Sequence, residues 1–466
     1  MDFLTNIIIL ESLETVVIKI VQLLLSLSLL IILHEGGHFL FSKLFKVRVE
    51  KFYLFFDAWN FSLFKYPRKK KSEDQTEYGI GWLPLGGYVK IAGMIDESMD
   101  KEQMAKEPQP WEFRTKPAWQ RLLIMLGGVI VNFIVAFIIY SMVLFVWGEQ
   151  YIKPTDMTYG LKFNAEAKAH GFQDGDQIFM IDNDTVEAWS VALVREISNA
   201  KTVTVKRGAG NVTLNMPENM NMLTMLEEPR YVSELIPMCV DTVIPGTPAE
   251  TIGLKKGDAI TSINGTAIAD HNELLWQMAS LRQTVDENSI ANDSLNARTV
   301  SLVINGTDTV TAVLSPDFTL GFVSAIPDYK VSKKEYGFFE SIPAGIAYGC
   351  ETLAGYVNDL KYVFTKEGSK QVGGFVAIGN IFPSVWDWRS FWTLTALLSI
   401  ILGFMNVLPI PALDGGHAVF AIYEIVTGRK PSEKFLERAQ LVGMIILFGL
   451  LIFANMNDIL RLLGVY

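Results

Sequence analysis

Long apolar runs dominate the pattern of hydrophobic and polar positions along the chain. Each run is long enough, or nearly so, to cross the hydrocarbon core of a bilayer as one helix. The runs cover residues 16–44, 122–147, 391–411 and 441–456. The pattern predicts a polytopic α-helical membrane protein with four transmembrane helices, whose two termini lie on the same side of the membrane. We place these helices within residues 1–45, 121–148, 390–427 and 439–457.

Lysine and arginine are concentrated in two of the loops between these helices. Residues 46–120 and 427–440 hold most of the basic residues near the helix ends, and the other flanks hold few. Cytoplasmic loops of membrane proteins carry such an excess of positive charge. We therefore expect both loops to be cytoplasmic, and the block 148–340 and both termini to be extracytoplasmic.

The extracytoplasmic block contains two similar units built from short strands and turns. Residues 165–189 and 243–268 each read as the start of a small-residue helix, then a glycine, a Gly-Asp turn and an Ile-centred strand. This pattern resembles the permuted PDZ domains of bacterial envelope proteases. We expect two inserted PDZ-like α+β domains, at 155–218 and 230–326.

The role of these two domains stays open at this point. PDZ folds bind peptides, often by adding a strand to an exposed sheet edge, so peptide C-termini or the ectodomains of substrates are candidate partners. Alternatively, the pair acts as a steric gate above the membrane. Two small β-rich domains of another kind also fit the pattern.

Composition narrows the classes of partner. Of 466 residues, 50% are hydrophobic, and the formal net charge of −10 argues against nucleic acid as a partner. The sequence has two cysteines, Cys239 and Cys350, which lie far apart and suggest neither a disulfide framework nor a thiolate metal cluster. Their redox state does not follow from the sequence.

The first apolar run contains three ionisable residues, in the sequence His34-Glu35-Gly36-Gly37-His38. Such groups are costly in hydrocarbon and mark functional sites. A helix places His34 and His38 on one face, where both can bind one zinc ion, and Glu35 can act as general base on water. A short HExxH pattern also arises by chance, but its position in an apolar helix favours a metal site. The two glycines predict the close approach of another segment, since glycine is unfavourable inside a helix.

A third metal ligand is expected at the end of the third apolar run, in NVLPIPALDGGH. Its two prolines break the helix and free backbone groups, which a membrane tolerates where the backbone lines a cavity. Catalytic zinc takes three protein ligands and keeps one open position, so we expect Asp414 to be the third ligand. His34 and Asn406 lie roughly 21 Å and roughly 22 Å along their helices at 1.5 Å per residue, which predicts that both motifs meet at one depth.

Together these motifs resemble the site-2 protease family of intramembrane zinc metalloproteases. HEGGH (34–38) matches the family's HExxH, and NVLPIPALDG (406–415) matches its NxxPxPxLDG. The order of the segments is similar to that of bacterial members with tandem PDZ domains, and the resemblance covers nearly the whole chain. It implies a zinc endopeptidase of the bacterial inner membrane.

The resemblance also implies roles for individual residues. His34, His38 and Asp414 would bind one zinc ion, Glu35 would activate water, and Asn406 would hold substrate near the metal. The family's substrates are single-span membrane proteins already trimmed outside the membrane, such as anti-sigma factors, and remnant signal peptides. The PDZ-like pair would exclude untrimmed substrates by size.

Residues 77–94 resemble the family's membrane-reentrant β-hairpin. The stretch is apolar, alternates in part and has Gly86 and Gly87 for a turn. An edge strand beside the metal would hold a substrate extended by strand addition, with Gly86 and Gly87 as candidate substrate contacts. A plain cytoplasmic hairpin is the alternative.

Residues 335–382 precede the third transmembrane helix. Apolar positions in 341–364 recur at mixed helical spacing, and the stretch resembles the family's amphipathic helix at the outer membrane surface. Residues 373–382 match a glycine-rich segment of the family loosely.

The chain departs from the family's pattern in two places. GGVIVN (127–132) has Val129 where the family usually has proline, but it keeps Asn132, a candidate substrate contact. The stretch 52–64 lacks the usual Gly-Phe-Gly turn, so the loop there takes another shape in this interpretation. Neither departure touches a predicted metal ligand.

Two points about the metal stay open. His417 follows Asp414 by three residues, and a role beside a ligand or at a helix start suits it better than ligation. Two histidines and a carboxylate also suit iron, although HExxH with glutamate as base favours zinc.

Two other classes of function fit parts of the sequence. A catalytically inactive membrane PDZ scaffold would use the outer domains, but it needs none of the metal motif. Metal content and a Glu35→Gln variant discriminate the two hypotheses. A transporter also contains broken helices and buried polar groups, but the apolar segments show no inverted repeat.

Overall fold

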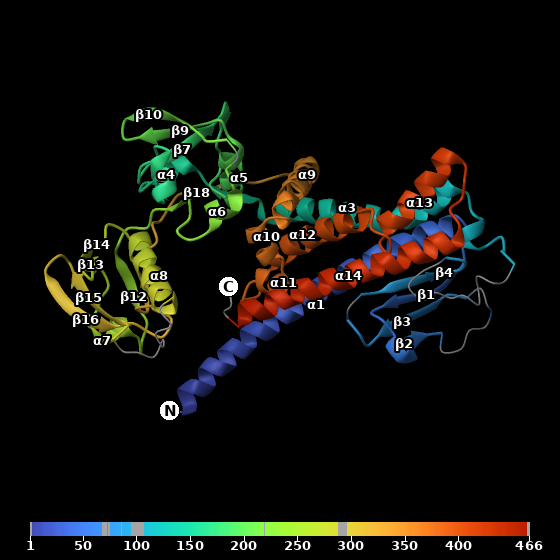
Figure 1. The fold of residues 1–466 in the computed structure, drawn as a ribbon, viewed down its shortest axis with the longest axis horizontal. Helices are drawn as coiled ribbons and strands as arrows, with labels where there is room; N and C mark the ends of the chain where they lie inside the picture. Colours follow the sequence, from blue (N-terminus) through green and yellow to red (C-terminus); the bar gives the residue numbers. More distant parts are fainter. Residues whose placement is uncertain are drawn as a thin grey trace. The chain divides into compact units, whose positions relative to one another are not determined.

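The computed structural model describes residues 2–67, 72, 75–84, 86–94, 107–218, 220–287 and 296–463. The chain folds as two compact units, whose elements are labelled in Figure 1. The membrane unit comprises Met1–Gly148 and Glu335–Tyr466, and the insert unit comprises Glu149–Lys334.

Four long apolar helices form the membrane unit, as predicted. They are the only helices among the described residues that are long and apolar enough to cross a membrane. Their bounds are α1 (Asp2–Leu44), α3 (Ala118–Trp147), α12 (Trp388–Val407) and α14 (Glu433–Leu462). Both α1 and α14 extend well beyond the apolar runs that predicted them.

The helix α3 lies at the centre of this unit. It contacts α1, α12, α9 (Phe338–Val363) and α13 (Asp414–Thr427). Its contact with α12 is a buried apolar cluster, which consists of Ala136, Ile139, Tyr140 and Val143 with Ala396 and Ile400.

Glycines bring α1 and α3 into backbone contact. A Cβ atom on Gly37 would overlap the backbone of Gly127 and Gly128, whereas a Cβ atom on Gly36 would meet nothing within 4 Å. The close approach that the glycine pair predicts is therefore confirmed at Gly37. Two helices can approach this closely only where no side chain separates them.

The third apolar run breaks at its prolines, as predicted. The helix α12 ends at Val407, the chain continues without regular structure, and α13 starts at Asp414. Gly415 packs against the carbonyl groups of Val407 and Leu408, where a Cβ atom would overlap them. This packing folds the chain back so that the start of α13 lies beside the end of α12.

A four-stranded sheet precedes α3. Its strands are β1 (Val49–Leu54), β2 (Ser62–Tyr66), β3 (Glu77–Gly81) and β4 (Tyr88–Ile91), in the order β2-β3-β1-β4. Both strands of the predicted hairpin at 77–94 are present, but they do not pair with each other. The strand β1 lies between them, parallel to β3 and antiparallel to β4. Residue 85, in the predicted turn, lies outside the described residues.

Packing of one aromatic ring explains this order. Tyr53 of β1 is 1% exposed and lies opposite Gly79 of β3, where a Cβ atom would overlap the tyrosine ring. On its other side Tyr53 lies opposite Tyr88 of β4, and the two rings stack with centroids 5.4 Å apart. The strand β4 is therefore an edge strand of a sheet rather than half of a hairpin.

Three helices occupy residues 338–381. The predicted amphipathic helix is α9, which buries Ser341, Gly345 and Gly349. A short helix α10 (Lys366–Gln371) follows, and the glycine-rich segment 373–382 contains α11 (Phe375–Ile381). Asp458 of α14 is 4% exposed and accepts hydrogen bonds from the backbone N–H groups of Gly374, Val376 and Ala377, which fastens this segment to α14.

The insert unit consists of two repeats with the same order of elements, as expected for two PDZ-like domains. The first repeat contains β6 (Leu161–Phe163), α4 (Ala165–Ala169), β7 (Gln177–Ile181), β8 (Asp184–Thr185), α5 (Val191–Asn199), β9 (Thr202–Arg207), β10 (Gly210–Asn215), a short α6 (Met222–Leu226) and β11 (Val232–Glu234). The second contains β12 (Val240–Val243), α7 (Pro248–Thr251), β13 (Ile260–Ile263), β14 (Thr266–Ala267), α8 (His271–Glu287), β15 (Thr299–Ile304), β16 (Asp308–Val313) and β17 (Phe322–Ser324). We call residues 161–234 domain 1 and residues 240–324 domain 2.

The two domains also share sheet topology. The sheets have the orders β10-β9-β7-β8 and β11-β6 in domain 1, and β14-β13-β15-β16 and β12-β17 in domain 2. The strands β5 (Glu149–Ile152) and β18 (Val331–Lys334) pair with each other and join the two ends of the insert unit.

Short 3-10 helices occupy Ala58–Asn60 and Phe113–Thr115 in the membrane unit and Pro154–Asp156 in the insert unit.

The boundary between the domains falls later than predicted. The expected second domain begins at residue 230, but β11 pairs with β6 of domain 1, with Val232 opposite Phe163. Tyr231 is fully buried beside the ring of Phe172, so this segment completes the core of domain 1. Each repeat thus ends with a strand that pairs with its own first strand.

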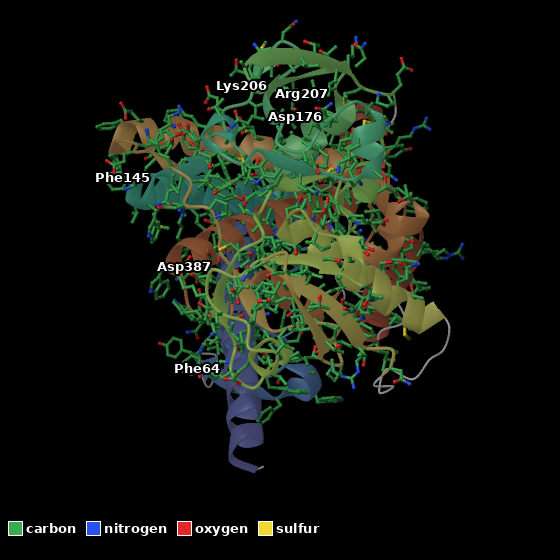
Figure 2. The ribbon with its side chains drawn as sticks, turned by 90° about the vertical axis from the view of Figure 1, so that its left-hand side faces the viewer. Phe64, Phe145, Asp176, Lys206, Arg207 and Asp387 are labelled. Atoms are coloured by element: carbon green, nitrogen blue, oxygen red, sulfur yellow. The ribbon has the colours of Figure 1, made fainter. Side chains whose placement is uncertain are left out.

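The predicted Gly-Asp turn of domain 1 is fixed by an ion pair. Asp176 is 1% exposed, and its two carboxylate oxygens lie 2.8 Å and 2.7 Å from Nε and Nη2 of Arg207 on β9. Figure 2 shows the two residues together, with Lys206 beside them. A buried carboxylate with a bidentate arginine partner holds the turn against the sheet.

Candidate metal centre

Two histidines on one face of α1 form the base of the site. His34 and His38 are one helical turn apart, and they are 8% and 6% exposed. Their Nε2 atoms lie 3.3 Å apart. The spacing of four residues therefore brings both imidazoles to one point, as the sequence predicts.

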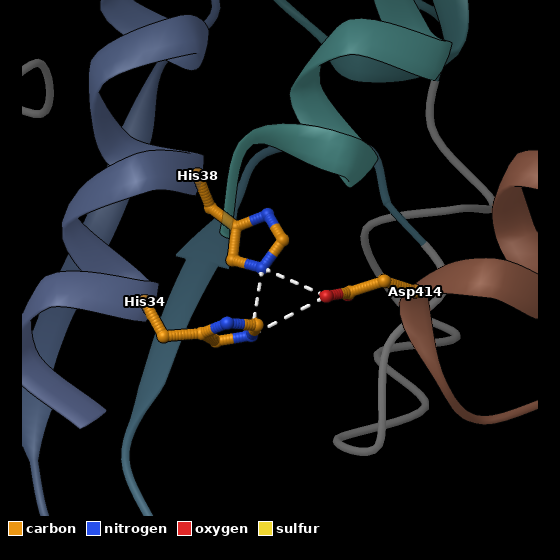
Figure 3. A group of neighbouring side chains, drawn as sticks. All are labelled: His34, His38 and Asp414. Atoms are coloured by element: carbon orange, nitrogen blue, oxygen red, sulfur yellow. Dashed lines mark hydrogen bonds and ion pairs between the residues drawn. The ribbon is translucent and has the colours of Figure 1, made fainter. Parts of the chain in front are cut away.

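Asp414, the first residue of α13, completes this group. Its Oδ2 atom lies 3.3 Å from Nε2 of each histidine (Figure 3). One ligand atom from each residue lies within 4.8 Å of the other two. Oδ2 is buried and has no hydrogen-bond donor among the described residues, which is the environment expected of an oxygen that binds a cation. Two imidazole nitrogens and one carboxylate oxygen are a donor set for catalytic zinc with one position left open.

The other ring nitrogens of the histidines face partners that leave Nε2 available. Nδ1 of His38 lies 2.8 Å from the carbonyl oxygen of Ile124. Because a carbonyl oxygen only accepts, Nδ1 carries the proton and donates a hydrogen bond to this oxygen. Nδ1 of His34 lies 3.0 Å from the side-chain amide of Asn132. The amide oxygen of Asn132 has no partner among the described residues in this orientation, and a half-turn of the amide lets it accept the Nδ1–H of His34. Second-sphere partners of this kind fix the tautomer of a metal-binding histidine.

This position changes the interpretation of Asn132. It is fully buried behind His34, and it is not among the described residues that line the cavity at the site. The structure thus places Asn132 in contact with a histidine rather than among the cavity-lining residues, and its contact with substrate stays a prediction. Ser399 of α12 donates a hydrogen bond of 2.8 Å to the backbone oxygen of Asn132, which ties α12 to the same point.

The rear wall of the site is the backbone of α3. A Cβ atom on Gly128 would lie 2.6 Å from Cε1 of His34 and 2.6 Å from Nε2 of His38. Gly127 packs on Gly37 in the same crossing. The glycines of α3 thus let both imidazoles rest directly on its main chain.

Glu35 lies beside the metal group, on the side of the sheet. Its carboxylate is hydrogen-bonded to the backbone of Val89 in β4. A Cβ atom on Gly87 would lie 3.5 Å from Cγ of Glu35, and one on Gly86 would meet the ring of Phe56. A Cβ atom on Gly87 would also overlap Ile31 of α1 and the carbonyl oxygen of Tyr53, so this glycine lets the chain that enters β4 pack against α1 and β1.

A cavity of about 750 Å³ opens in front of these groups. It is lined by His34, Glu35 and His38, by residues 86–91 around β4, and by Asn406, Asp414 and His417. Nδ2 of Asn406 lies 3.4 Å from Nε2 of His34, which confirms that both motifs lie at one depth. His417 lines the cavity but is not part of the group of three ligand atoms within 4.8 Å.

The prediction from sequence missed a polar cluster that also faces this cavity. Lys51 and Asp57 line the cavity, and their side chains lie 3.0 Å apart. The hydroxyl of Tyr88 donates a hydrogen bond of 2.8 Å to Asp57. The signal was present in FYLFFDAWNF, where a single aspartate interrupts an apolar stretch.

Comparisons with known proteins agree on one family. The model of peptidase family M50 matches residues 22–450. The regulator of sigma E protease of Haemophilus influenzae is 26% identical to the chain, over 94% of the chain and 98% of that protein. The metalloprotease MmpA of Caulobacter vibrioides is 26% identical over 95% of the chain and 96% of that protein. The protease RseP of Yersinia pestis is 26% identical over 94% and 98%.

Proposed function

The chain belongs to peptidase family M50 and is a membrane zinc metalloprotease, and we propose that it cuts the membrane-spanning segments of single-span proteins. The proposed substrates are anti-sigma-factor-like proteins that another protease has already trimmed outside the membrane, and remnant signal peptides. The name of the Haemophilus influenzae relative, which refers to a sigma factor, supports the first class.

One observation carries this proposal. Nε2 of His34, Nε2 of His38 and Oδ2 of Asp414 converge inside a unit of apolar helices, beside Glu35 and a cavity. We assign one zinc ion per chain to these three atoms. A zinc ion held there would polarise the scissile carbonyl group and make water a stronger nucleophile.

Glu35 is the proposed general base. Glu35 follows His34 directly on α1 and lines the same cavity as the three proposed ligands. It would take the proton of the attacking water and then give that proton to the leaving amine. Asn406 lies at the mouth of the metal group and would orient the substrate with its side-chain amide.

The strand β4 is the proposed substrate guide. A helical substrate hides its peptide bonds in intrahelical hydrogen bonds, so cleavage requires an extended segment. The edge strand β4 lines the cavity, and its Val89 is hydrogen-bonded to Glu35, so the free edge of β4 faces the general base. A substrate segment that adds to this edge would present its peptide bonds beside Glu35, and Gly86 and Gly87, which line the same cavity, are proposed to contact it.

The proposed location is the bacterial inner membrane. The distribution of lysine and arginine supports cytoplasmic loops at 46–120 and 427–440. In this orientation the PDZ-like domains and both termini are extracytoplasmic. The domains then meet the outer parts of substrates, either by binding peptide ends or ectodomains, or by excluding large ones.

Purified protein tests this function against the scaffold hypothesis. We expect one zinc per chain and cleavage of a model single-span substrate. The Glu35→Gln variant should keep its zinc and lose cleavage by about 100–10,000-fold, since it removes the general base. Equal cleavage by both forms would refute the role of Glu35. A chain without zinc would refute the metal site and leave the scaffold as the function.

A further inference from the structure

The insert unit contains a buried lysine that none of the proposed chemistry uses. Lys162 of β6 is fully buried. Its Nζ atom lies 2.7 Å from Asp174, 2.6 Å from Asp270 and 2.7 Å from Glu273. We call these four residues the Lys162 cluster.

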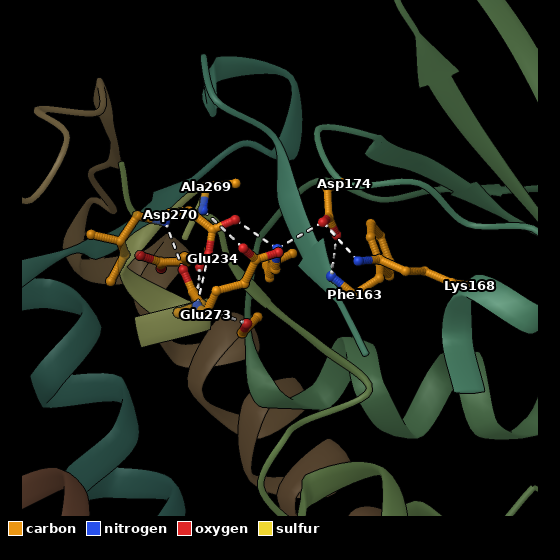
Figure 4. Close-up of polar contacts among 11 residues, drawn as sticks. Phe163, Lys168, Asp174, Glu234, Ala269, Asp270 and Glu273 are labelled. Atoms are coloured by element: carbon orange, nitrogen blue, oxygen red, sulfur yellow. Dashed lines mark hydrogen bonds and ion pairs between the residues drawn. The ribbon is translucent and has the colours of Figure 1, made fainter. Parts of the chain in front are cut away.

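The cluster joins the two PDZ-like domains. Lys162 and Asp174 belong to domain 1, whereas Asp270 and Glu273 lie at the start of α8 in domain 2. Figure 4 shows Asp174 on one side of the cluster and Asp270 with Glu273 on the other. The bonds therefore cross the domain boundary, over 108 and 111 residues of sequence.

The carboxylates on domain 2 are also the cap of α8. Asp270 accepts a hydrogen bond of 2.9 Å from the backbone N–H of Glu273 through Oδ1, and Glu273 accepts one of 2.9 Å from Ala269 through Oε2. The arrangement is similar to a capping box, except that Glu273 accepts from the residue before the N-cap rather than from Asp270 itself. The remaining oxygen of each residue binds Lys162. The lysine of domain 1 is thus bound to the two side chains that start a helix of domain 2.

Asp174 is shared in a similar way within domain 1. Its Oδ1 accepts a hydrogen bond of 3.1 Å from the backbone N–H of Phe163, and its Oδ2 binds both Lys162 and Lys168. Carboxylate oxygens of Asp174, Asp270 and Glu273 lie within 4.8 Å of one another, close enough to hold a metal ion. The ammonium group of Lys162 takes the place that such a cation would occupy.

Further contacts near the cluster hold the N-terminal end of α8 against domain 1. The side chain of Asn272 donates hydrogen bonds to Ser233 Oγ at 3.3 Å and to the backbone oxygen of Glu234 at 3.0 Å, both on β11. Nζ of Lys162 also lies 5.4 Å from the ring centre of Trp276, one turn along α8. The start of α8 is therefore held from two strands of domain 1.

We propose that Lys162 is a clasp that holds domain 1 and domain 2 together as one rigid body. The clasp works because the ammonium balances carboxylates from both domains, which repel each other without it. The effect of the clasp on substrate selection rests on the proposed function. In that function, the two domains held together, rather than either domain alone, exclude substrates with a large extracytoplasmic part. Opening the clasp would let the domains separate and admit untrimmed substrates.

Distances between spin labels on the full chain test the clasp without relying on activity. Exposed Lys206 in domain 1 and Thr309 in domain 2 are changed to cysteine for labelling, in a chain with Cys239→Ser and Cys350→Ser. We expect a narrow distance distribution in the parent chain and a broad one in Lys162→Met. Lys168→Met is the matched control, because Lys168 binds the same Asp174 from within domain 1. It should leave the distribution narrow.

A second variant separates the clasp from folding of the domains. Asn at 270 and Gln at 273 keep acceptors for both capping hydrogen bonds but remove the charges that hold Lys162. The double variant Asp270→Asn/Glu273→Gln should therefore broaden the distribution while α8 keeps its protection from hydrogen exchange. Narrow distributions in both this variant and Lys162→Met would overturn the clasp.

Cleavage assays then test the consequence for substrate selection. With the clasp opened, we expect cleavage of an untrimmed single-span substrate to rise several-fold while cleavage of the trimmed form is unchanged. A broadened distribution with unaltered discrimination would refute the role in selection and keep the clasp. If the parent chain cleaves neither form of the substrate, the result counts against the proposed function. The distance measurement then still shows whether Lys162 holds the two domains together.

Discussion

The side-chain amide of Asn132 lies 3.0 Å from Nδ1 of His34, whereas the other ring nitrogen, Nε2, lies 3.3 Å from Oδ2 of Asp414. A fully buried residue of α3 thus sets the orientation of a metal-facing histidine of α1. The proton that Asn132 holds at Nδ1 keeps the lone pair of Nε2 directed at the metal position.

The Asn132→Ala variant should bind zinc about 10–100-fold more weakly, since loss of such a second-sphere partner has this effect in other zinc sites. Competition with a chelator of known affinity measures the change. Ser399→Ala is the control, because it removes the bond to the backbone of Asn132 and leaves the amide in place. Zinc affinity equal to that of the parent chain would contradict the assigned role.

The two glycines of the HEGGH motif should differ in their tolerance of alanine. Gly37→Ala forces a Cβ atom into the backbone of α3, and overpacking of this kind costs about 1–3 kcal/mol. Gly36→Ala meets nothing within 4 Å and should stabilise the helix by up to about 1 kcal/mol. Thermal unfolding and zinc content of both variants measure the difference. A destabilised Gly36→Ala with an intact Gly37→Ala would contradict the crossing geometry.

Zinc content should separate the metal ligands from their polar neighbour. His38→Ala and Asp414→Ala each remove one of the three converging ligand atoms and should leave the purified chain with little zinc. His417→Ala should keep about one zinc per chain, since a catalytic site needs only three protein ligands. Elemental analysis after dialysis gives the answer, and loss of zinc from His417→Ala would make His417 a ligand.

The Lys162 cluster should give the insert unit a plateau of stability between acid and alkaline pH. Burial raises the pKa of Asp174 and Glu273, but hydrogen bonds from Lys162, Lys168 and nearby backbone N–H groups, with the charge of Lys162, together lower both pKa values below their usual range. The stability they contribute is present above their unfolded pKa of about 4 and is lost as pH falls through the folded pKa. Burial lowers the pKa of Lys162, but bonds to the three carboxylates together raise this pKa by more than burial lowers it. The contribution of Lys162 to the stability of the insert unit is therefore lost only at strongly alkaline pH.

Hydrogen exchange of the α8 amides across pH measures this dependence. In the parent chain, protection should fall as the solution is acidified below about pH 4. In Lys162→Met the acid-induced loss should shrink, because the carboxylates have lost the partner that lowers their pKa. The variant should also be less protected at neutral pH, since removing one partner of a buried ion pair costs about 3–5 kcal/mol. An unchanged acid profile would show that Lys162 does not set the charge of the cluster.

Much of the metal site followed from the sequence, because local rules place its residues. Helical periodicity puts His34 and His38 on one face, and the prolines after Val407 break the helix at the depth of His34. The contact between Asn406 and His34 at 3.4 Å shows that this estimate of depth was sound. The four apolar helices were predicted for the same reason, since each is a property of one continuous segment.

The features that sequence reasoning missed depend on contacts between distant segments. The strand β1 lies between β3 and β4, where the ring of Tyr53 packs over Gly79. These two residues are far apart in sequence, so no local pattern predicts their contact. The contact of Asn132 with Nδ1 of His34 joins residues that are 98 apart in sequence, so no local pattern predicts it. Lys162 reads as an ordinary surface lysine until Asp270, which lies 108 residues further on, is brought beside it.

The glycine crossing of α1 and α3 has a consequence for how such an enzyme can diversify. At Gly128 the main chain of α3 lies directly against both imidazoles, so a side chain added at this position would displace the histidines. Substitutions that alter substrate preference without loss of the metal group are therefore expected among the cavity-lining side chains of β4 and around Asp57.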